Sequence, residues 1–488
     1  MQGGSAKQFF RHGDDPGCAQ PRVKLWVRPG CLIMAGAHHK MDAEYRQQEQ
    51  VRQVEQEKPT IFVLTASYPY SVAAERTFLE PEIERFVKKF SRVVIVPQDV
   101  SGQCSQVPAG AHVDVSLAKS LSRPARSSLL LRGLASLALY REIQKNAWLL
   151  LRPKTLLRTA VFLGRAKVIG QWVERTGISV ERHGGGLLFY GFWLDVSALG
   201  LGMLRSRLHA PFGVVARAHG GDLYAERHTP QYIPFQEQMI DLLDWVSPDS
   251  MGGAEYLRRK YPQHAKKIWP ALLGTDDPGF AATASDDGKV RVVSCAFLVE
   301  VKRIDLLVRG VAELSGRMPG TSIEWTHFGD GPIYAEIKEL AEKILPPNVQ
   351  WRLMGHVDTS TIYKWYRENP VDVFVNVSSS EGTPVSIMEA ISCSIPVVAT
   401  AVGGNKEIVS GANGALLSQH PEPIEIAEAI ESVCLSPKNR LTLREGSRAM
   451  WDAKYNAGKN YMDYANRLIE LAAQLASKPS DSRSSRGV

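Results

Sequence analysis

The hydrophobic pattern from residue 60 to about residue 274 alternates short β-branched runs with segments of helical period. The predicted strands are residues 61–66, 92–97, 187–192, 213–219 and 244–248. The predicted helices between them are residues 77–90, 127–148, 156–176 and 251–260. Strands that alternate with helices in this way predict a doubly wound α/β domain.

A cleaner alternation follows in the second half of the chain. The predicted strands there are residues 290–297, 322–329, 349–355, 371–378, 396–400 and 414–418. They are almost continuously apolar, which is typical of parallel strands that are covered by helices on both faces. The pattern therefore predicts two Rossmann-like α/β domains in tandem.

The 488 residues are enough for two or three domains. A stretch rich in Gly, Asp and Ala at residues 274–289 is the predicted linker. The expected organisation is a disordered N-terminal extension (1–58), an N-terminal Rossmann-like domain (59–274), a C-terminal Rossmann-like domain (275–450), a terminal helix (451–476) and a disordered tail (477–488).

Composition and charge narrow the class of protein. Hydrophobic residues make up 44% and charged residues 22%, which excludes a wholly disordered, collagen-like or coiled-coil chain. The formal charge is only +7, but residues 121–210 hold 14 basic and four acidic residues, a net charge of +10. Such a segment fits either an anionic membrane surface or a solvated basic face. Nucleic acid is disfavoured, because no nucleic-acid-binding module is present.

The six cysteines show no CxxC pair, which favours buried free thiols in a reducing compartment over a zinc site or disulfides. Residues 128–151 and 185–204 are apolar but interrupted by charged residues, so neither is expected to span a bilayer. No signal peptide is recognised. The expected location is therefore cytoplasmic, with peripheral attachment to the inner face of the membrane as an extension of that hypothesis.

The densest cluster of polar and small residues is segment 378–390, directly after a predicted strand. Ligands of open α/β sheets bind at this carboxyl edge. Pro384 suits the first turn of a helix whose free amides favour an anion. Glu381 precedes this helix and Glu389 lies inside it. Either the two carboxylates contact one elongated ligand, or Glu381 simply caps the helix and Glu389 is incidental.

The spacing of Glu381 and Glu389 resembles the E-x7-E pattern of retaining glycosyltransferases with the GT-B fold, family 4 (group 1). The resemblance continues through residues 396–400 and 402–414, and upstream through a glycine loop at 328–332 and a base-binding loop at 355–357. Together these motifs cover nearly all of residues 290–418 in the family's order.

The resemblance implies that Glu389 binds the ribose of a nucleotide-sugar and that Glu381 holds the transferred sugar. Lys302 would neutralise the diphosphate, whose charge grows in the transition state. The full set of implied donor-binding residues is Lys302, Arg303, Gly329, Gly331, His356, Val357, Gly382, Thr383, Pro384, Val385 and Glu389. No DxD-like motif stands at a strand end, so no metal is expected, and no cofactor, because the nucleotide-sugar is a substrate.

One departure from the family is the pair Ala296-Phe297, where many relatives have Gly-Arg. The missing Arg would supply a second phosphate contact. Arg303, which follows Lys302, is expected to compensate.

The amino-terminal half resembles the polysaccharide-biosynthesis branch of the family, through residues 68–70, 77–83, 190–193 and 217–224. This resemblance implies that His219 lies with Glu381 in the catalytic site, with neither assigned as a nucleophile. A histidine at a strand end is also a common structural hydrogen-bonding residue. The implied acceptor-binding residues are Tyr68, Trp193, Arg217 and Asp222.

The resemblance therefore implies a retaining hexosyltransferase that acts on a saccharide or lipid-linked saccharide in cell-surface polysaccharide synthesis. Residues 451–476 resemble the tail that crosses back onto the first domain in GT-B enzymes. A sugar-nucleotide epimerase and a non-catalytic nucleotide-sugar-binding partner of an assembly complex remain as alternatives.

Overall fold

The computed structural model describes residues 58–70, 73–178, 186–434 and 437–477. The expected disordered extension and tail lie outside the described residues, apart from Lys58 and Ser477. Cys18 and Cys31 also lie outside them.

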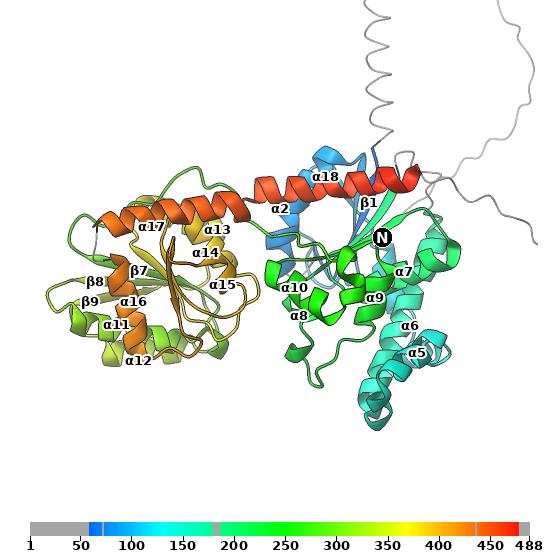
Figure 1. Cartoon of the computed structure of the whole chain (residues 1–488), viewed down its shortest axis with the longest axis horizontal. Helices are drawn as coiled ribbons and strands as arrows, with labels where there is room; N and C mark the ends of the chain where they lie inside the picture. Colours follow the sequence, from blue (N-terminus) through cyan, green and yellow to red (C-terminus); the bar gives the residue numbers. More distant parts are fainter. Residues whose placement is uncertain (1–57, 71–72, 179–185, 435–436, 478–488) are drawn as a thin grey trace, which may run out of the picture. The chain divides into compact units, whose positions relative to one another are not determined.

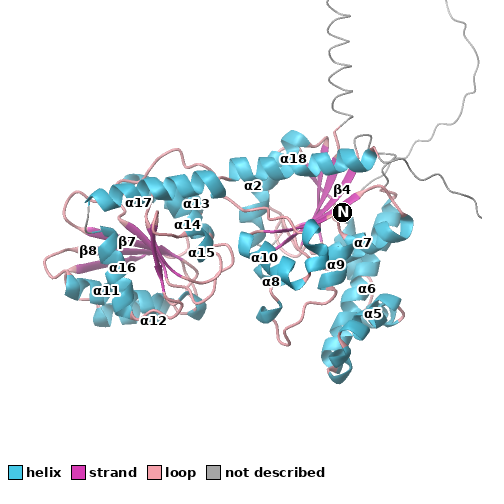
Figure 2. Cartoon of the chain, viewed as in Figure 1, coloured by secondary structure: helices cyan, strands magenta, loops and turns pink. Residues whose placement is uncertain are grey.

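The first half of the chain forms a six-stranded parallel sheet in the order β3-β2-β1-β4-β5-β6 (Figure 2). Its strands are β1 (Thr60–Thr65), β2 (Arg92–Pro97), β3 (Ala111–Val113), β4 (Leu187–Gly191), β5 (Gly213–Ala218) and β6 (Trp245–Pro248). The helical elements are α2 (Ala73–Lys89), α3 (Ser116–Ser122), α4 (Arg126–Leu134), α5 (Leu137–Lys145), η1 (Ala147–Leu151), α6 (Pro153–Thr176), α7 (Val196–Leu208), α8 (Gly220–Leu223), η3 (Ala225–Arg227), α9 (Gln236–Leu242), α10 (Met251–Lys260) and η4 (Pro262–Lys267).

The second half forms another six-stranded parallel sheet, in the order β12-β11-β10-β7-β8-β9 (Figure 2). Its strands are β7 (Val290–Cys295), β8 (Ile323–Phe328), β9 (Val349–Leu353), β10 (Val373–Asn376), β11 (Val397–Thr400) and β12 (Gly414–Leu417). The helical elements are η5 (Glu300–Lys302), α11 (Ile304–Arg317), α12 (Tyr334–Ile344), α13 (Thr359–Glu368), α14 (Val385–Ser392), α15 (Asn405–Ile408), α16 (Pro423–Cys434), α17 (Pro437–Met450), η6 (Trp451–Tyr455) and α18 (Ala457–Ala476).

The central strands of each sheet are buried on both faces, which is why they are apolar at nearly every position, whereas the edge strands β3 and β9 are partly exposed. The strand β1 alternates its side chains between two cores: Phe62 and Leu64 pack with α6 and α7, whereas Ile61 and Val63 pack with α2. The second sheet likewise separates two cores. The predicted class, two doubly wound parallel domains, is confirmed.

The last helix, α18, packs on the first sheet although it comes at the end of the chain. Its Tyr464 and Leu468 lie in the same core as Ile61 and Ile83 of β1 and α2. The first domain therefore contains residues from both ends of the described chain.

Three features of the first domain differ from the predicted elements. The single helix predicted over residues 127–148 is broken, because Ser136 is extended and separates α4 from α5. The helix α7 (Val196–Leu208) begins within segment 185–204, and no helix was predicted there. The three-residue strand β3 was also missed. No helix in the described ranges is long and apolar enough to cross a bilayer.

Candidate active site

The carboxyl edge of the second sheet carries most of the residues that the sequence singles out. β7 and β10 are parallel neighbours at its centre, and the strand order reverses between them. Loops that leave the sheet at such a point diverge and open a crevice for a ligand. Lys302 follows β7 and Glu381 follows β10, so both lie on loops at this edge.

Lys302 and Glu381 form an ion pair in this crevice. Lys302 Nζ donates to Glu381 Oε1 at 2.7 Å, and Asn376 Nδ2 donates to the same oxygen at 3.1 Å. Glu381 is buried, whereas Lys302 is partly exposed. No donor within the described ranges contacts Glu381 Oε2, so this oxygen is available to a ligand.

The guanidinium of Arg303 supports the loop that carries Glu381. Its Nε donates to Val377 O at 2.6 Å and its Nη2 to Ser378 O at 2.9 Å. Burial lowers the pKa of Arg303. These bonds give Arg303 a positioning role that sequence reasoning did not foresee, alongside its expected phosphate contact. Phe297, in the loop after β7, is exposed.

The glycine loop after β8 lies directly on the loop after β7. Gly329 has a φ of +141°, and a Cβ there would lie 1.9 Å from Ala296 O. A Cβ on Gly331 would lie 2.3 Å from Leu298 O. Any larger residue would force the two loops apart, so these glycines are required by the close backbone approach.

The loop that contains His356 and Val357 is tied to this glycine loop. Gly329 N donates to Gly355 O at 2.9 Å. His356 is exposed, and Val357 is half-buried against the core beside α13 and α14. The structure therefore joins the glycine loop and the expected base-binding loop at one edge of the sheet.

Residues 382–385 form the entry to α14. Pro384 is the N-cap, and Val385 is the first helical residue. Gly382 O accepts a hydrogen bond from Gly404 N at 3.0 Å. A Cβ on Gly403 would lie 2.0 Å from Glu381 O, so the loop after β11 packs closely on this entry. The amino end of α14, with Thr383 beside it, is favourable for negative charge.

Glu389 lies inside α14 and is buried. Thr359 Oγ1 donates to Glu389 Oε1 at 3.2 Å. Burial raises the pKa of the Glu389 carboxyl to about 7. A hollow of about 370 Å³ borders it and is also lined by Val385, Thr359 and Tyr363. Glu389 therefore faces a space that a ligand can enter.

His219 directly follows β5, and its ring packs against two aromatic side chains. Its centroid lies 4.5 Å from that of Phe192 and 4.7 Å from that of Trp193. Neither ring nitrogen has a partner in the described part of the chain. Burial, and secondarily the charge of Arg217, lowers the pKa of His219 to about 3. The neutral imidazole can therefore donate one hydrogen bond through one ring nitrogen and accept one through the other.

Asp222 positions the backbone around His219. Its carboxylate accepts hydrogen bonds from the amides of His219 and Leu194, the latter at 2.7 Å. Burial raises the pKa of Asp222 to about 8. Each of its oxygens is used by a backbone amide, so the geometry favours support of His219 over acceptor binding.

Glu75 organises the loop after β1. It accepts hydrogen bonds from the amides of Ala66, Ser67 and Tyr68, at 2.8, 2.9 and 2.9 Å, and from Trp193 Nε1 at 2.6 Å. The Tyr68 side chain is buried in the core, so the expectation that it contacts an acceptor is not supported. Trp193 stays partly exposed beside His219.

Arg217, which was expected to bind an acceptor, lies in the core of the first domain. Arg217 is 0% exposed. Its Nη2 pairs with Glu82 Oε1 at 2.6 Å, its Nε donates to Tyr190 Oη at 2.7 Å, and the guanidinium lies 4.6 Å from the centroid of the Tyr464 ring. A charge in this position can be buried because its partners satisfy it, and no surface remains for an acceptor.

Sequence reasoning missed three polar residues beside the predicted ones. Asn376 and Thr359 hydrogen-bond Glu381 and Glu389, and Arg227 Nη2 donates to Glu381 O at 3.2 Å. Asn376 ends β10 at the ligand-binding edge, a position that its sequence context could have revealed. Thr359 and Arg227 carry no such signal, because their partners are distant in the chain.

No group of three His, Cys, Asp or Glu side chains that could bind a metal occurs within the described ranges. The four cysteines there are free thiols: Cys393 and Cys434 are buried, Cys295 is partly buried, and Cys104 is exposed. Burial raises the pKa of Cys295 and Cys393 to about 12, so neither is a reactive thiolate at neutral pH.

Residues 289–435 match the family model for glycosyl transferases group 1. The chain is 31% identical over 222 residues to the UDP-N-acetylglucosamine–peptide N-acetylglucosaminyltransferase GtfA subunit of Streptococcus pneumoniae serotype 4, covering 43% of this chain and 42% of that protein. It is 25% identical over 190 residues to protein CapJ of Staphylococcus aureus, covering 38% and 46%. The chain thus spans less than half the length of these curated relatives.

Two solved structures share the fold over most of the chain. The lipopolysaccharide outer core galactosyltransferase WaaB has a TM-score of 0.57 at 13% identity, covering 84% of this chain and 99% of that one. Anabaena HepE in complex with UDP has a TM-score of 0.55 at 16% identity, covering 84% and 100%. At these identities the likeness shows the fold alone. The chain therefore has the GT-B fold, and its match to the group 1 glycosyl transferases lies in its second domain.

Proposed function

We propose that this chain is a retaining, metal-independent glycosyltransferase that moves a hexose from a nucleotide-sugar to a saccharide or lipid-linked saccharide. The observation that carries the proposal is the Lys302–Glu381 pair at the strand-order reversal of the group 1 domain, with Asn376 on the same carboxylate. Buried Glu389 lies inside the helix that follows.

In the proposed reaction, the bond between the anomeric carbon and a diphosphate oxygen breaks, and an acceptor hydroxyl bonds to the same face of the sugar. The proton of that hydroxyl leaves with the diphosphate. Lys302 and the amino end of α14 offset the growing charge of the leaving group. Glu381 and His219 hold the sugar without forming a covalent bond to it, and Glu389 binds the ribose.

The proposed acceptor is an intermediate of a capsule, an exopolysaccharide or an O-antigen. The resemblance of residues 68–70, 77–83, 190–193 and 217–224 to the polysaccharide-biosynthesis branch supports a cell-surface glycan as acceptor. Such intermediates are carried on lipid, so we propose that the protein is cytoplasmic and attaches peripherally to the inner face of the membrane. The proposed partners are the donor, the acceptor and an anionic membrane surface, and exclude nucleic acid.

The donor is tested by thermal unfolding with UDP-, GDP- and ADP-sugars. We expect a UDP-sugar to stabilise the protein, because the name of the pneumococcal GtfA relative specifies a UDP-sugar. At a ligand concentration 100 times the Kd, the expected gain is about 2.7 kcal/mol. The variant Lys302→Ala should lose about half of this gain or more. Lys364→Ala, which removes an exposed lysine on α13, should keep it. No shift with any nucleotide-sugar would contradict the proposal.

Product analysis distinguishes transfer from the two alternative activities. With a UDP-sugar and a panel of glycan and peptide acceptors, we expect a glycoside with the anomeric configuration of the donor, and equal yield with a chelator present. An altered sugar nucleotide without acceptor would instead identify an epimerase. Donor binding without any product would identify a non-catalytic partner.

Donor affinity is expected to rise with pH. Because the pKa of Glu389 is about 7, its carboxyl is mostly protonated at pH 6 and mostly ionised at pH 8. Only the ionised form accepts ribose hydrogen bonds with both oxygens, so the affinity should rise by up to about tenfold over this interval. Isothermal titration calorimetry with an intact nucleotide-sugar measures the donor Kd at each pH. Neither the diphosphate diester of the donor nor His219 titrates between pH 6 and pH 8, so these two groups do not contribute to the change.

The matched control for this pH dependence is Glu389→Gln, which cannot ionise. We expect its affinity to be lower and constant between pH 6 and 8. An affinity of the unmodified protein that falls with pH, or a Gln variant with the same slope, would remove Glu389 from the donor site.

A further inference from the structure

A group of helices inserted between β3 and β4 carries a surface that the proposed site does not use. The later part of α6 packs into the core of the first sheet through Leu163, Ile169 and Trp172, whereas α4, α5 and η1 pack on α6 itself. Figure 1 shows α5 and the first turns of α6 lying away from the strands. We call residues 121–158 the basic-apolar tip.

Close helix contacts make this tip a rigid platform. A Cβ on Gly133 of α4 would lie 1.9 Å from Ala160 O of α6, and a Cβ on Gly164 of α6 would lie 2.0 Å from Leu129 O of α4. The two helices therefore touch backbone to backbone. The side chains that they present to solvent are held by regular structure and not by a loose loop.

Large apolar side chains are concentrated on the outside of the tip. Of the sixteen that are exposed in the described part of the chain, seven belong to it: Leu131, Leu134, Leu137, Tyr140, Leu150, Leu151 and Leu157. Leu151 is 84% and Leu137 76% exposed, the highest values of the set. Such a cluster of apolar side chains on a solvent-exposed surface is typical of an interaction site.

The tip is also positively charged on its outside. It contains eight basic residues: Arg123, Arg126, Arg132, Arg141, Lys145, Arg152, Lys154 and Arg158. Its one acid, Glu142, is buried and accepts hydrogen bonds from Tyr232 Oη at 2.7 Å and Asn146 Nδ2 at 3.1 Å. Glu237 of the neighbouring α9 pairs with Lys145 at 2.7 Å. Arg132 is half-buried and donates to Gln171 Oε1 at 2.9 Å, whereas the other six cations of the tip are exposed.

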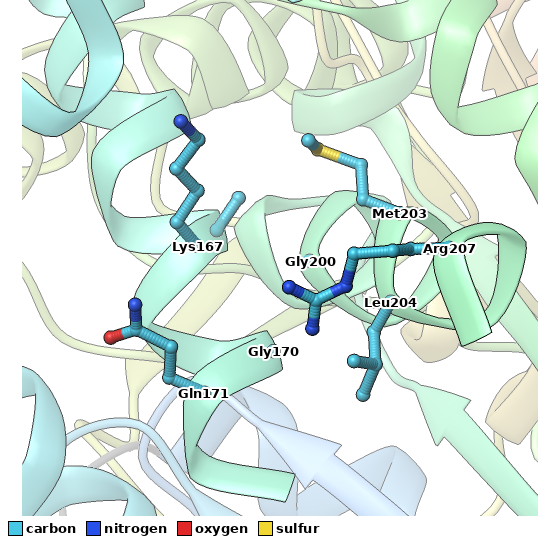
Figure 3. Close-up of a pocket in the computed structure, with 8 residues that line it drawn as sticks. Lys167, Gly170, Gln171, Gly200, Met203, Leu204 and Arg207 are labelled. Atoms are coloured by element: carbon cyan, nitrogen blue, oxygen red, sulfur yellow. The ribbon is translucent and has the colours of Figure 1, made fainter. Parts of the chain in front are cut away.

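A groove of about 310 Å³ between α6 and α7 borders the tip and extends its positive surface. Figure 3 shows Lys167 and Arg207 on opposite sides of this groove, with Met203 on its wall. Lys167 Nζ donates to Arg132 O of α4 at 3.0 Å, which joins the groove to the tip. Arg207 also pairs with Glu174 at 2.5 Å.

From these observations we infer that the basic-apolar tip docks onto a bilayer that contains anionic lipid. The exposed leucines enter the interfacial region, and the surrounding arginines and lysines lie at the level of the lipid phosphates. Only an anionic amphiphilic surface complements both features together. The inference rests on the peripheral attachment proposed above and identifies the surface responsible, but its test does not require transfer activity.

The test is co-sedimentation of the full chain with phosphatidylcholine vesicles, with or without phosphatidylglycerol. We expect binding to the anionic vesicles to be at least tenfold stronger than to the neutral ones. Arg141→Glu/Arg152→Glu/Lys154→Glu should lose about 100-fold in affinity for anionic vesicles, because each reversed charge acts near the surface. Leu137→Ser/Leu151→Ser should lose about tenfold.

Matched controls lie on the second domain. Lys338→Glu/Lys343→Glu/Lys364→Glu reverses three exposed lysines, and Ile424→Ser/Leu441→Ser removes two exposed apolar side chains. These variants should bind within about twofold of the unmodified protein.

Several outcomes would overturn the inference: equal binding to both vesicles, binding to neither, or equal losses in the tip and control variants. A dimer in size-exclusion chromatography that the leucine variant dissociates would also overturn it, in favour of self-association. Retained thermal unfolding and a retained UDP-sugar shift show that a tip variant is folded, so this inference can fail while the proposed donor site stands.

Discussion

Glu381→Ala is expected to lower kcat by about 100-fold while it changes the donor Kd by only a few-fold. Glu381 accepts hydrogen bonds from Lys302 at 2.7 Å and Asn376 at 3.1 Å, so its position is defined before a ligand binds. Its loss removes a group that holds the transferred sugar, but it leaves the lysine charge for the diphosphate. The effect should therefore appear in turnover, measured by steady-state kinetics with a direct binding assay.

Lys302→Ala should show the opposite pattern, with a donor Kd raised by at least about tenfold, because the fixed cation near the diphosphate is lost. Glu368→Ala is the matched control for Glu381→Ala, since Glu368 is 60% exposed on α13 and its ion pair there, with Lys364, is 4.0 Å long. Normal turnover in Glu381→Ala, or an unchanged donor Kd in Lys302→Ala, would refute the site assignment.

Arg217→Met should lower the free energy of unfolding by about 3–5 kcal/mol, the largest stability effect that we expect in the first domain. Arg217 and Glu82 are 0% and 1% exposed and pair at 2.6 Å, so the substitution leaves a buried carboxylate without its cation. It also removes the guanidinium from the ring of Tyr464, which attaches α18 to this domain. Urea denaturation measures the loss.

The exposed pair Arg76–Glu80, 2.7 Å apart on α2, is the control for this effect. Arg76→Met should cost at most about 1 kcal/mol, because solvent already screens that pair. The double variant Arg217→Met/Glu82→Leu should recover part of the loss, since no buried charge remains unpaired. A loss below about 1 kcal/mol in Arg217→Met would show that the buried pair is not needed for stability.

The sequence predicts the strands well because a parallel strand that is buried on both faces must be apolar along its length. Eleven of the twelve strands in the described ranges begin and end within two residues of a predicted run, and β3 was missed. Helix α10 has the predicted bounds, residues 251–260; in the structure Ser250 caps its start and basic residues lie in its last turn.

The errors lie where a contact distant in the chain decides the local structure. Ser136 separates α4 from α5, and Gly133 of α4 packs against Ala160 of α6. Gly200 reads as a helix-breaking residue, yet it lies within α7 because a Cβ there would be 2.3 Å from Ala166 O of α6. No local pattern shows that a neighbouring helix needs this space.

The same division applies to the candidate site. The two doubly wound domains and the loops that carry Lys302, Glu381 and Glu389 could be predicted, because they follow from local periodicity and from motifs at strand ends. Which polar side chains are buried at those strand ends depends on contacts that form only in the folded domain. Arg217 was expected at the acceptor but is buried against Glu82, 135 residues away in the chain. A charged side chain at a strand end is either exposed to a ligand or buried in an ion pair, depending on which partner the folded chain places beside it. Because that partner can be distant in the sequence, the residues around the strand end do not reveal it.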